Sequence, residues 1–449
     1  MVVSALRSSV AGRVITSNDA EYDQARRLFY GGMDRRPDAI AQVADPGDVA
    51  RVVTLTREAG TTLAVRSGGH SVAGHSVTDG GVVLDLAGLR ACEIDPAAGI
   101  AWAGPGLTAG EFTTAAAEYG LAVGFGDTGS VGLGGLTLGG GVGYLSRRCG
   151  LTIDSLLAAD IVTADGQLVR ADVDSHPDLY WAIRGGGGNF GVATRFQFRL
   201  HHVSTVVGGM LVLPATAEVI AGFAAAASEA PEELSTIANI VPAPPMPFIP
   251  TEMHGQFVVL AMLVYAGEEA AADLVLAPFR ALATPIADLV QPVPYPDVFP
   301  PEPEDYHPVA ASRNLFVDAI DAGTATLILD RLRASTASMA ATQVRVLGGA
   351  VAAVPDAATA YAHRRRKIMV NVAAMYERPE EESTHEEWAA DFAAALQNGN
   401  LGAYVNFLGH DGAARIREAY PSPVWERLLD VKRRYDPDNL FRANQNISP

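Results

Sequence analysis

The amino-terminal part of the chain alternates short apolar runs with segments rich in glycine, aspartate and proline. A helix is predicted from Pro46 to Glu58, because Asp45 is a good N-cap, proline suits the first helical position, and valines recur at helical spacing. Gly60 ends this helix. Strands are predicted where apolar runs lie between turn residues, at Ala39–Val43, Leu63–Arg66 and Val82–Leu86. Sheets of this open kind commonly bind ligands at the carboxyl ends of their strands.

The same reading predicts hairpins and further helices up to about Leu200. Asp165-Gly166 is a strong turn signal between two apolar runs. Hairpins are predicted from the pairs 93–95 with 100–103 and 156–164 with 167–171. Helices are predicted at 19–30, 108–118 and 177–183.

After Leu200 the glycine-rich loops give way to helical, extended and proline-rich segments. A helix is predicted at 215–228, and two more at 412–420 and 423–435. The runs 343–347 and 367–375 predict strands. Two segments, 242–250 and 292–303, are too rich in proline for regular elements, and we expect extended loops there, as a lid or as stiff connectors.

Two stretches contain an unusual density of glycine. In the first, 65–71, a strand ends in Ser67-Gly68-Gly69 and then presents His70. Adjacent glycines let main-chain N–H groups face one concavity that holds phosphate oxygens, and Arg66 would add a positive charge. Alone, this stretch reads more simply as a turn with a surface histidine. The second stretch, Thr128–Tyr144, changes that interpretation, because its backbone is expected to lie against a large ligand that spans both.

Three glycine patterns resemble known motifs, but each departs from its motif in sequence or in context. Gly104-Pro-Gly106 fits a dinucleotide-binding fingerprint, yet the strand before it belongs to a local hairpin. The run 186–191 fits the same pattern, but the residues after it alternate like a strand and offer no helix N-terminus. The run 128–132 lacks the first glycine of a nucleophile elbow. These patterns therefore favour neither a Rossmann domain nor a hydrolase.

Composition sets limits without naming a reaction. A chain of 449 residues exceeds the size of a single core, so two domains or subdomains are expected. No apolar run approaches the ~20 residues of a membrane span, and the first residues lack the apolar segment of a secretory signal. We therefore expect a cytoplasmic protein without a membrane partner. The net charge of −18 argues against a nucleic-acid partner. Cys92 and Cys149 predict neither a disulfide framework nor a metal site.

Four ordered motifs carry a resemblance that covers nearly the whole chain. They are RSGGHS at 66–71, GGGVGYLSRRCGLTIDS at 139–155, RGGGGNFGVAT at 184–194 and YDPDNLFRANQNI at 435–447. The chain resembles the FAD-linked oxidases of the berberine bridge enzyme-like group, in the vanillyl-alcohol oxidase superfamily.

This resemblance implies how FAD is held. His70 falls at the histidine that is bonded to the 8α-methyl of the flavin, and His75 is a less favoured candidate. Thr128 stands where many relatives carry a second, cysteine link, so one covalent link is expected. Val131 lies where a residue gates the access of dioxygen, and valine there is permissive. The residues expected to contact FAD are His70, Arg66, Ser67, Gly68, Gly69, Ser71, Thr128, Gly129, Val131, Gly132, Gly139, Gly140, Gly141, Val142, Gly143, Val192, Asn444 and Asn446.

The resemblance also implies a catalytic pair. Tyr404 begins a Y-x-N motif whose tyrosine is a base beside the flavin in several relatives, and Asn371 falls where some relatives place a helper of that tyrosine. The alternatives are an interface tyrosine and a structural asparagine. Leu347 and Gly349 replace acidic residues that accompany an amine substrate in one relative, which disfavours nicotine-like substrates.

The expected fold is α+β, with a two-part FAD-binding domain at 1–200 and 402–449 and a substrate domain at 201–401 whose antiparallel sheet is covered by helices. The expected activity is a two-electron oxidation of a C–H bond in an alcohol, amine or similar group of a small organic molecule, such as a secondary metabolite or carbohydrate. Dioxygen would be the partner that accepts the electrons, yielding hydrogen peroxide. A dehydrogenase of the same fold and a flavin-holding protein without turnover are the alternatives. The sequence leaves the substrate and the oligomeric state open.

Overall fold

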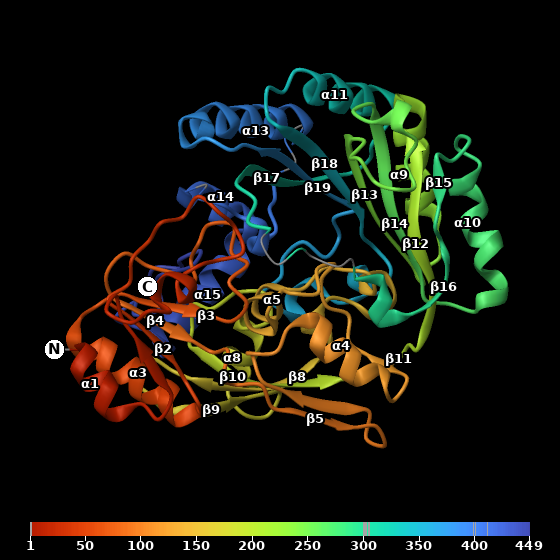
Figure 1. Cartoon of the computed structure of the whole chain (residues 1–449). Coiled ribbons are helices and arrows are strands. Elements are labelled where there is room, and N and C mark those ends of the chain that lie inside the picture. Colours follow the sequence, from red (N-terminus) through yellow and green to blue (C-terminus); the bar gives the residue numbers. More distant parts are fainter. Residues whose placement is uncertain (1, 300–302, 304–305, 398, 400, 411) are drawn as a thin grey trace.

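The computed structural model describes residues 2–299, 303, 306–397, 399, 401–410 and 412–449. Within this part of the chain, the strands form three main sheets and one short pair. Figure 1 shows a lower half built from the beginning of the chain, an upper half dominated by one large sheet, and C-terminal helices that lie with the lower half. The α+β class expected from the sequence is confirmed. None of the described helices is long and apolar enough to cross a membrane.

The first sheet has four strands in the order β1-β2-β4-β3, of which β2, β4 and β3 are parallel. The helix between its strands forms as predicted, because Asp45 accepts a hydrogen bond from the N–H of Asp48 at 2.8 Å and Gly60 takes a left-handed φ of 62°. The elements of this part are α1 Val2–Ser9, β1 Arg13–Ile15, α2 Tyr22–Ala25, β2 Ala39–Gln42, α3 Pro46–Ala59, β3 Leu63–Arg66 and β4 Val82–Asp85.

The second sheet is antiparallel, in the order β5-β6-β10-β8-β9. β6 lies antiparallel between β5 and β10, so Gly104-Pro-Gly106 follows no parallel strand and the rejection of a Rossmann fingerprint is confirmed. β7 pairs with β11 beside this sheet. The elements are β5 Cys92–Asp95, β6 Ile100–Ala103, α4 Ala109–Ala117, β7 Leu121–Ala122, α6 Ser146–Cys149, α7 Thr152–Ser155, β8 Leu156–Val162, β9 Leu168–Ala171, α8 Pro177–Ala182, β10 Val192–Arg199 and β11 His201–His202.

The third sheet has eight strands in the order β15-β12-β14-β13-β18-β19-β17, with β16 also paired to β12. Its strands are β12 Thr205–Pro214, β13 Leu234–Pro242, β14 Phe257–Tyr265, β15 Ala287–Asp288, β16 Gln291–Pro294, β17 Ala310–Val317, β18 Met339–Val346 and β19 Ile368–Met375. Four helices cover its outer face (Figure 1): α9 Ala217–Glu229, α10 Ala272–Arg280, α11 Ala322–Arg333 and α13 Glu382–Gln397. Since strand residues alternate between faces, Val344 and Val372 pack in the core under these helices while Gln343 and Asn371 face the other way.

Three predictions of local structure need correction. The segment 19–30 holds only α2, because most of it belongs to turns. The second glycine stretch contains a helix, α5 Leu133–Gly139, whose residues are mostly buried. In the segment 292–303, Gln291–Pro294 pairs as β16 and Tyr295–Val298 forms the 3-10 helix η3, while 300–302 lie outside the described residues. The remaining short helices are η1 Thr251–Met253, η2 Glu269–Ala271, α12 Ala350–Ala353, η4 Asp356–Ala358, η5 Pro379–Glu381 and η6 Val405–Phe407.

The C-terminal helices α14 Gly412–Ala419 and α15 Ser422–Tyr435 are followed by a tail that is fixed by one buried ion pair. The Nζ of Lys432 lies 2.6 Å from Asp436 and also donates to the carbonyl oxygens of Asn189 and Phe441. Asp436 accepts from the N–H groups of Leu440 and Phe441 as well. Both charges are buried, and their bonds hold the turn after α15 in shape and fix it to Asn189, so this pair sets the course of the chain toward Asn444.

Candidate active site

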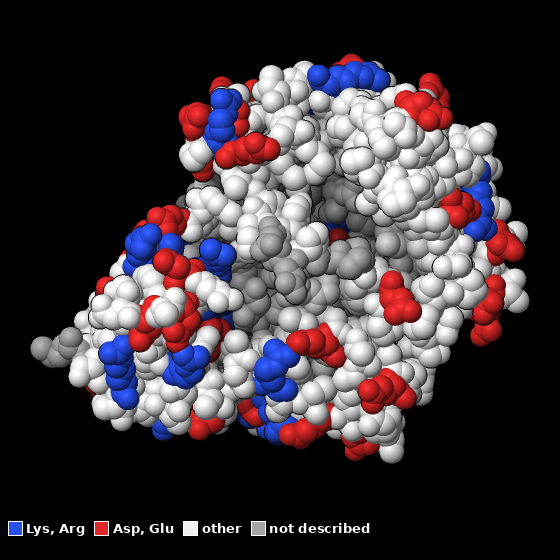
Figure 2. All heavy atoms as spheres, viewed as in Figure 1, with Lys and Arg blue, Asp and Glu red and all other residues white. Residues whose placement is uncertain are grey.

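A cavity of about 940 Å³ lies between the inner face of the eight-stranded sheet and the glycine-rich loops of the lower half. Figure 2 shows the molecule hollowed at its centre, with few charged side chains around the hollow. The cavity lies within the size range of small-molecule and cofactor sites. It is formed by segments that are far apart in the sequence, from Phe29 to Gln445.

Most of the residues expected from the sequence line this cavity. The predicted residues that line it are Ser67, Gly68, Gly69, His70, Ser71, Thr128, Val131, Gly132, Gly141, Val142, Val192, Asn371, Tyr404 and Asn444. The predicted residues that do not line it are Arg66, Gly129, Gly139, Gly140, Gly143 and Asn446.

The two glycine-rich stretches cross each other at their backbones. A Cβ atom added to Gly68 would lie 2.2 Å from the backbone nitrogen of Gly132, and one added to Gly132 would lie 2.2 Å from that of Gly68. Ser67 fixes the crossing, because its Oγ accepts from the N–H of Gly134 at 3.1 Å and donates to the carbonyl of Pro105 at 2.5 Å. Glycine is therefore required at Gly68 and Gly132 for the contact between the stretches.

Other glycines of the second stretch make room for side chains of the C-terminal segment. A Cβ at Gly139 would lie 1.9 Å from Oδ1 of Asn406, and one at Gly140 would lie 3.0 Å from the ring of Tyr404. On the side where a Cβ would point, Gly139 and Gly140 therefore contact protein, and a contact of their backbone with a ligand stays a prediction. Gly143 likewise faces the backbone of Phe125 and Gly126.

His70 lies in the cavity with its ring held from two sides. The ring of Phe29 stacks on it, with centroids 4.1 Å apart and planes inclined by 19°. Its Nε2 is 3.0 Å from Oγ of Ser130, a hydrogen-bonding distance. Burial lowers the pKa of His70 to about 4, and a hydrogen bond with the backbone of Ser130 offsets only part of that effect. The imidazole is therefore neutral at physiological pH, which is the nucleophilic form.

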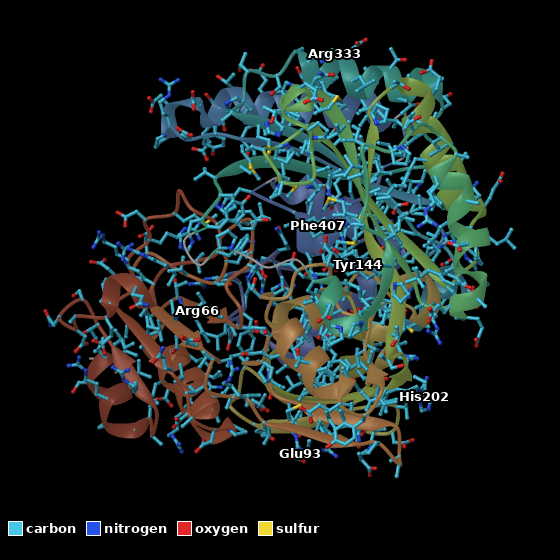
Figure 3. All side chains as sticks on the ribbon, turned by 45° about the vertical axis from the view of Figure 1, so that its right-hand side comes forward. Arg66, Glu93, Tyr144, His202, Arg333 and Phe407 are labelled. Carbon is cyan, nitrogen blue, oxygen red and sulfur yellow. The ribbon has the colours of Figure 1, made fainter. Side chains whose placement is uncertain are left out.

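Arg66 does not supply the charge expected of it. Its guanidinium ion-pairs with Asp85 at 2.8 Å at the end of β3 and β4, and both side chains are buried. Arg66 lies in the lower half of the molecule, away from the eight-stranded sheet (Figure 3). Its charge is neutralised within the first sheet, so the N–H groups of the glycine stretches are left to meet an anion.

Tyr404 is buried at the centre of the cavity wall. Its hydroxyl oxygen accepts from the N–H of Gly141 at 2.8 Å and from the side chain of Asn406 at 2.9 Å. Burial raises the pKa of the phenol to about 12, while these two donors and the charge of Arg345 lower it. The backbone N–H of Tyr404 donates to Oδ1 of Asn314 at 2.8 Å, which fixes the residue against β17. The phenol oxygen is thus surrounded by groups that stabilise its ionised form.

Arg345 and Asp127 form an ion pair of 2.7 Å across the cavity, from β18 to the lower half. Arg345 also donates to Oε1 of Gln343 at 2.7 and 2.9 Å and to the carbonyl of Val142 at 3.2 Å. Its guanidinium carbon lies 5.0 Å from the ring centroid of Phe407, which is near the centre of Figure 3. The strand of Arg345 pairs with that of Asn371.

Asn371 faces the cavity from β19, on the same side as Ala373. Its Oδ1 is buried without a hydrogen-bond partner. The side chain that donates to the hydroxyl of Tyr404 is that of Asn406, two residues along the same short turn. Asn371 therefore presents a free acceptor to the cavity.

Four residues of the site were missed in the sequence. Asn406 was visible as the last residue of the Y-x-N motif. Phe29, Asp127 and Ser130 carried no usable signal, since Phe29 lies in a turn and the partners of Asp127 and Ser130 are 218 and 60 residues away.

The lining suits a large cofactor that carries phosphates and a ring system. Gly135 and Gly188 line the cavity, and a Cβ added to either would meet no atom within 4 Å, so their backbones are open to a ligand. The buried Oδ1 of Asn444 and Nε2 of His75 also lack partners. Buried polar atoms of this kind are usually satisfied, so they are suited to bonds with a bound molecule.

Comparisons with known proteins agree with this lining. Residues 37–172 match the model of an FAD binding domain, and residues 403–448 match the model described as berberine and berberine like. The chain is 30% identical to (R)-6-hydroxynicotine oxidase of Paenarthrobacter nicotinovorans over 98% of this chain and 97% of that protein. It is 28% identical to xylooligosaccharide oxidase of Thermothelomyces thermophilus, over 97% and 92% of the two chains.

A solved structure extends the likeness to the fold. The crystal structure of 6-hydroxy-D-nicotine oxidase from Arthrobacter nicotinovorans superposes with a TM-score of 0.87 at 28% identity, over 98% of each chain. The FAD-binding fold with an antiparallel substrate sheet, as in the vanillyl-alcohol oxidase superfamily, is confirmed. The chain belongs to the berberine bridge enzyme-like family of FAD-linked oxidoreductases.

Proposed function

We propose that the protein is an oxidase that removes two electrons from a C–H bond next to oxygen or nitrogen in a small organic substrate. The observation that carries the proposal is Tyr404, a phenol at the cavity wall whose oxygen accepts two hydrogen bonds. The names of the relatives, which oxidise a nicotine derivative and xylooligosaccharides, support the class of reaction. The domain division at residues 200 and 402 and a cytoplasmic location belong to the same proposal.

FAD supplies the redox chemistry when bound, since it accepts two electrons from a substrate and passes them on. The N–H groups of the crossed glycine stretches would hold its pyrophosphate, because the charges of Arg66 and Arg345 are already paired. Asn444 would satisfy a polar atom of the cofactor through its free Oδ1. His70 would carry the single covalent link, in the neutral form that its low pKa maintains.

Tyr404 would take the proton that the substrate loses. An alcohol that gives up a hydride from carbon and a proton from oxygen becomes a carbonyl compound, and dioxygen takes up the two electrons with two protons as hydrogen peroxide. The N–H of Gly141 and the side chain of Asn406 stabilise the ionised phenol, and Arg345 adds a positive charge nearby. Asn371 would position the substrate through its free acceptor.

A dehydrogenase and a flavin-holding protein remain the alternatives, and one experiment separates the three. Candidate substrates are incubated with the flavin-containing protein under air with a peroxide assay, and then without air with an artificial electron acceptor. We expect peroxide under air, and fast reoxidation of the reduced protein that Val131→Leu slows. Reduction of the acceptor without peroxide would favour the dehydrogenase, and neither product would favour the holder.

The covalent link is tested by acid precipitation. We expect the precipitate of the unmodified protein to stay yellow and His70→Ala to release its flavin into the supernatant. His75→Ala is the matched control, because His75 also lines the cavity and burial also lowers its pKa to about 4. Fragmentation of the flavin-bearing peptides that located the flavin on the side chain of His75 or of Cys149 would contradict a single link through His70.

The role of Tyr404 is tested by the pH dependence of flavin reduction. Because the phenol has a pKa of about 12, its ionised fraction grows about tenfold per pH unit between pH 7 and 9, and the rate constant should rise with it. Tyr404→Phe should lower the rate by ~10²–10⁴-fold and flatten this profile. Anaerobic stopped-flow measurements with a substrate from the peroxide screen provide the rates. An unchanged rate and profile in Tyr404→Phe would return this residue to a structural role.

A further inference from the structure

The inner face of the eight-stranded sheet carries a row of carboxamide side chains. Asn239 on β13 pairs with Gln343 on β18, and Gln343 pairs with Asn371 on β19, so the three residues stand side by side across neighbouring strands. All three line the cavity, and we call them the amide row. The row continues to Asn314 on β17, whose Oδ1 accepts from the backbone of Tyr404. The polar row therefore runs toward the proposed base.

The orientation of the amide row is fixed by its neighbours. Oε1 of Gln343 accepts both bonds from Arg345, so its Nε2 is turned to Oδ1 of Asn239 at 3.0 Å. Gln343 is thus bonded on both sides, to Arg345 and to Asn239. Asn371 differs, since its buried Oδ1 lacks a partner. An amide row that offers one free buried acceptor suits a single oxygenated edge of a substrate.

Next along the strands the lining becomes apolar. Ala341 and Ala373 pair across β18 and β19 and leave space, and the following pair is Met339 with Met375. Met246 lines the same side of the cavity, together with Pro242, Pro244, Val241 and Leu260. We call Met246, Met339 and Met375 the methionine wall. Methionine adapts to the shape of a ligand and contacts aromatic rings favourably.

Charge excludes two classes of substrate. Among the described residues that line the cavity, Asp127 and Arg345 are the only aspartate, glutamate, lysine or arginine, and they pair with each other. A buried ammonium or carboxylate without an opposite charge is unfavourable.

An oligosaccharide is unfavourable for a different reason, because each hydroxyl group that faced the alanines or the methionine wall would lose its hydrogen bonds to water.

We infer that the substrate of the proposed oxidase is an uncharged hydroxylated ring compound, with its oxygenated edge on the amide row and an apolar, aromatic body against the methionine wall. This inference rests on the proposed function in one respect, which is that the cavity is the active site. The amide row next to Tyr404 brings the hydroxyl group to the proposed base, and the wall sets the orientation of the ring.

The inference is tested by binding, without turnover. Dissociation constants are measured without air at pH 7, in a stopped-flow instrument, from the fast shift of the oxidised-flavin band of the holoenzyme that precedes any flavin reduction; the probes are 2-naphthol, 2-naphthoate, 2-naphthylmethylammonium and xylobiose. 2-Naphthol is uncharged and has no oxidisable C–H next to its oxygen, so it reports binding alone. We expect it to bind at least about tenfold more tightly than each of the others. Equal or tighter binding of a charged naphthalene or of xylobiose would overturn the inference.

Two substitutions at one position test the amide row. Asn371→Ala should weaken 2-naphthol about tenfold, the loss of one buried hydrogen bond, whereas Asn18→Ala, at an exposed asparagine outside the cavity, should change nothing. Asn371→Asp keeps the shape and should tighten 2-naphthylmethylammonium about tenfold by supplying a charge. Unchanged constants in both variants would remove Asn371 from the substrate site. If the binding preferences are as expected but Tyr404→Phe reduces its flavin at an unchanged rate, the proposed function alone is contradicted.

Discussion

The crossing of the two glycine-rich stretches at Gly68 and Gly132 is the contact on which the site depends. Their backbones approach so closely that neither position has room for a Cβ atom. The crossing fixes the segment that carries His70 against the segment that leads through α5 to Gly141. Because Gly141 donates to Tyr404, the same framework sets the place of the proposed base. Residues of three distant parts of the chain are thereby held around one cavity.

Burial acts on the two reactive side chains in opposite directions. Desolvation disfavours the charged form of each, so it lowers the pKa of His70 and raises that of Tyr404. For His70 the result is a neutral nucleophile. For Tyr404, desolvation opposes formation of the phenolate that would act as the base, and Gly141, Asn406 and Arg345 partly offset this effect. The paired charges of Arg345 and Asp127 leave the substrate side of the cavity without a free ion, which is the basis of the inferred preference for uncharged molecules.

Local signals in the sequence predicted much of the fold, but few of the hydrogen bonds and ion pairs of the site. α3 and the hairpins follow from caps, turns and apolar alternation, which depend on neighbouring residues. α5 was missed because glycine disfavours helices, and tertiary packing overrides that preference here. The motif resemblance identified His70 and Tyr404, and both line the cavity. The pairing of Arg66 with Asp85 and of Asp127 with Arg345 depends on long-range geometry that no local pattern records.

The most direct test is the flavin content of Gly132→Ala. The added Cβ would collide with the backbone of Gly68, and overpacking of this kind costs ~1–3 kcal/mol, which is about a fivefold to hundredfold change in an equilibrium, so the purified protein should hold less than roughly a fifth of the flavin of the unmodified protein. Gly323→Ala is the control, because on the outer helix α11 the new Cβ would meet only Asp321, at 3.5 Å. Low flavin in Gly132→Ala with full flavin in Gly323→Ala is the predicted result. Full flavin in Gly132→Ala would contradict the account.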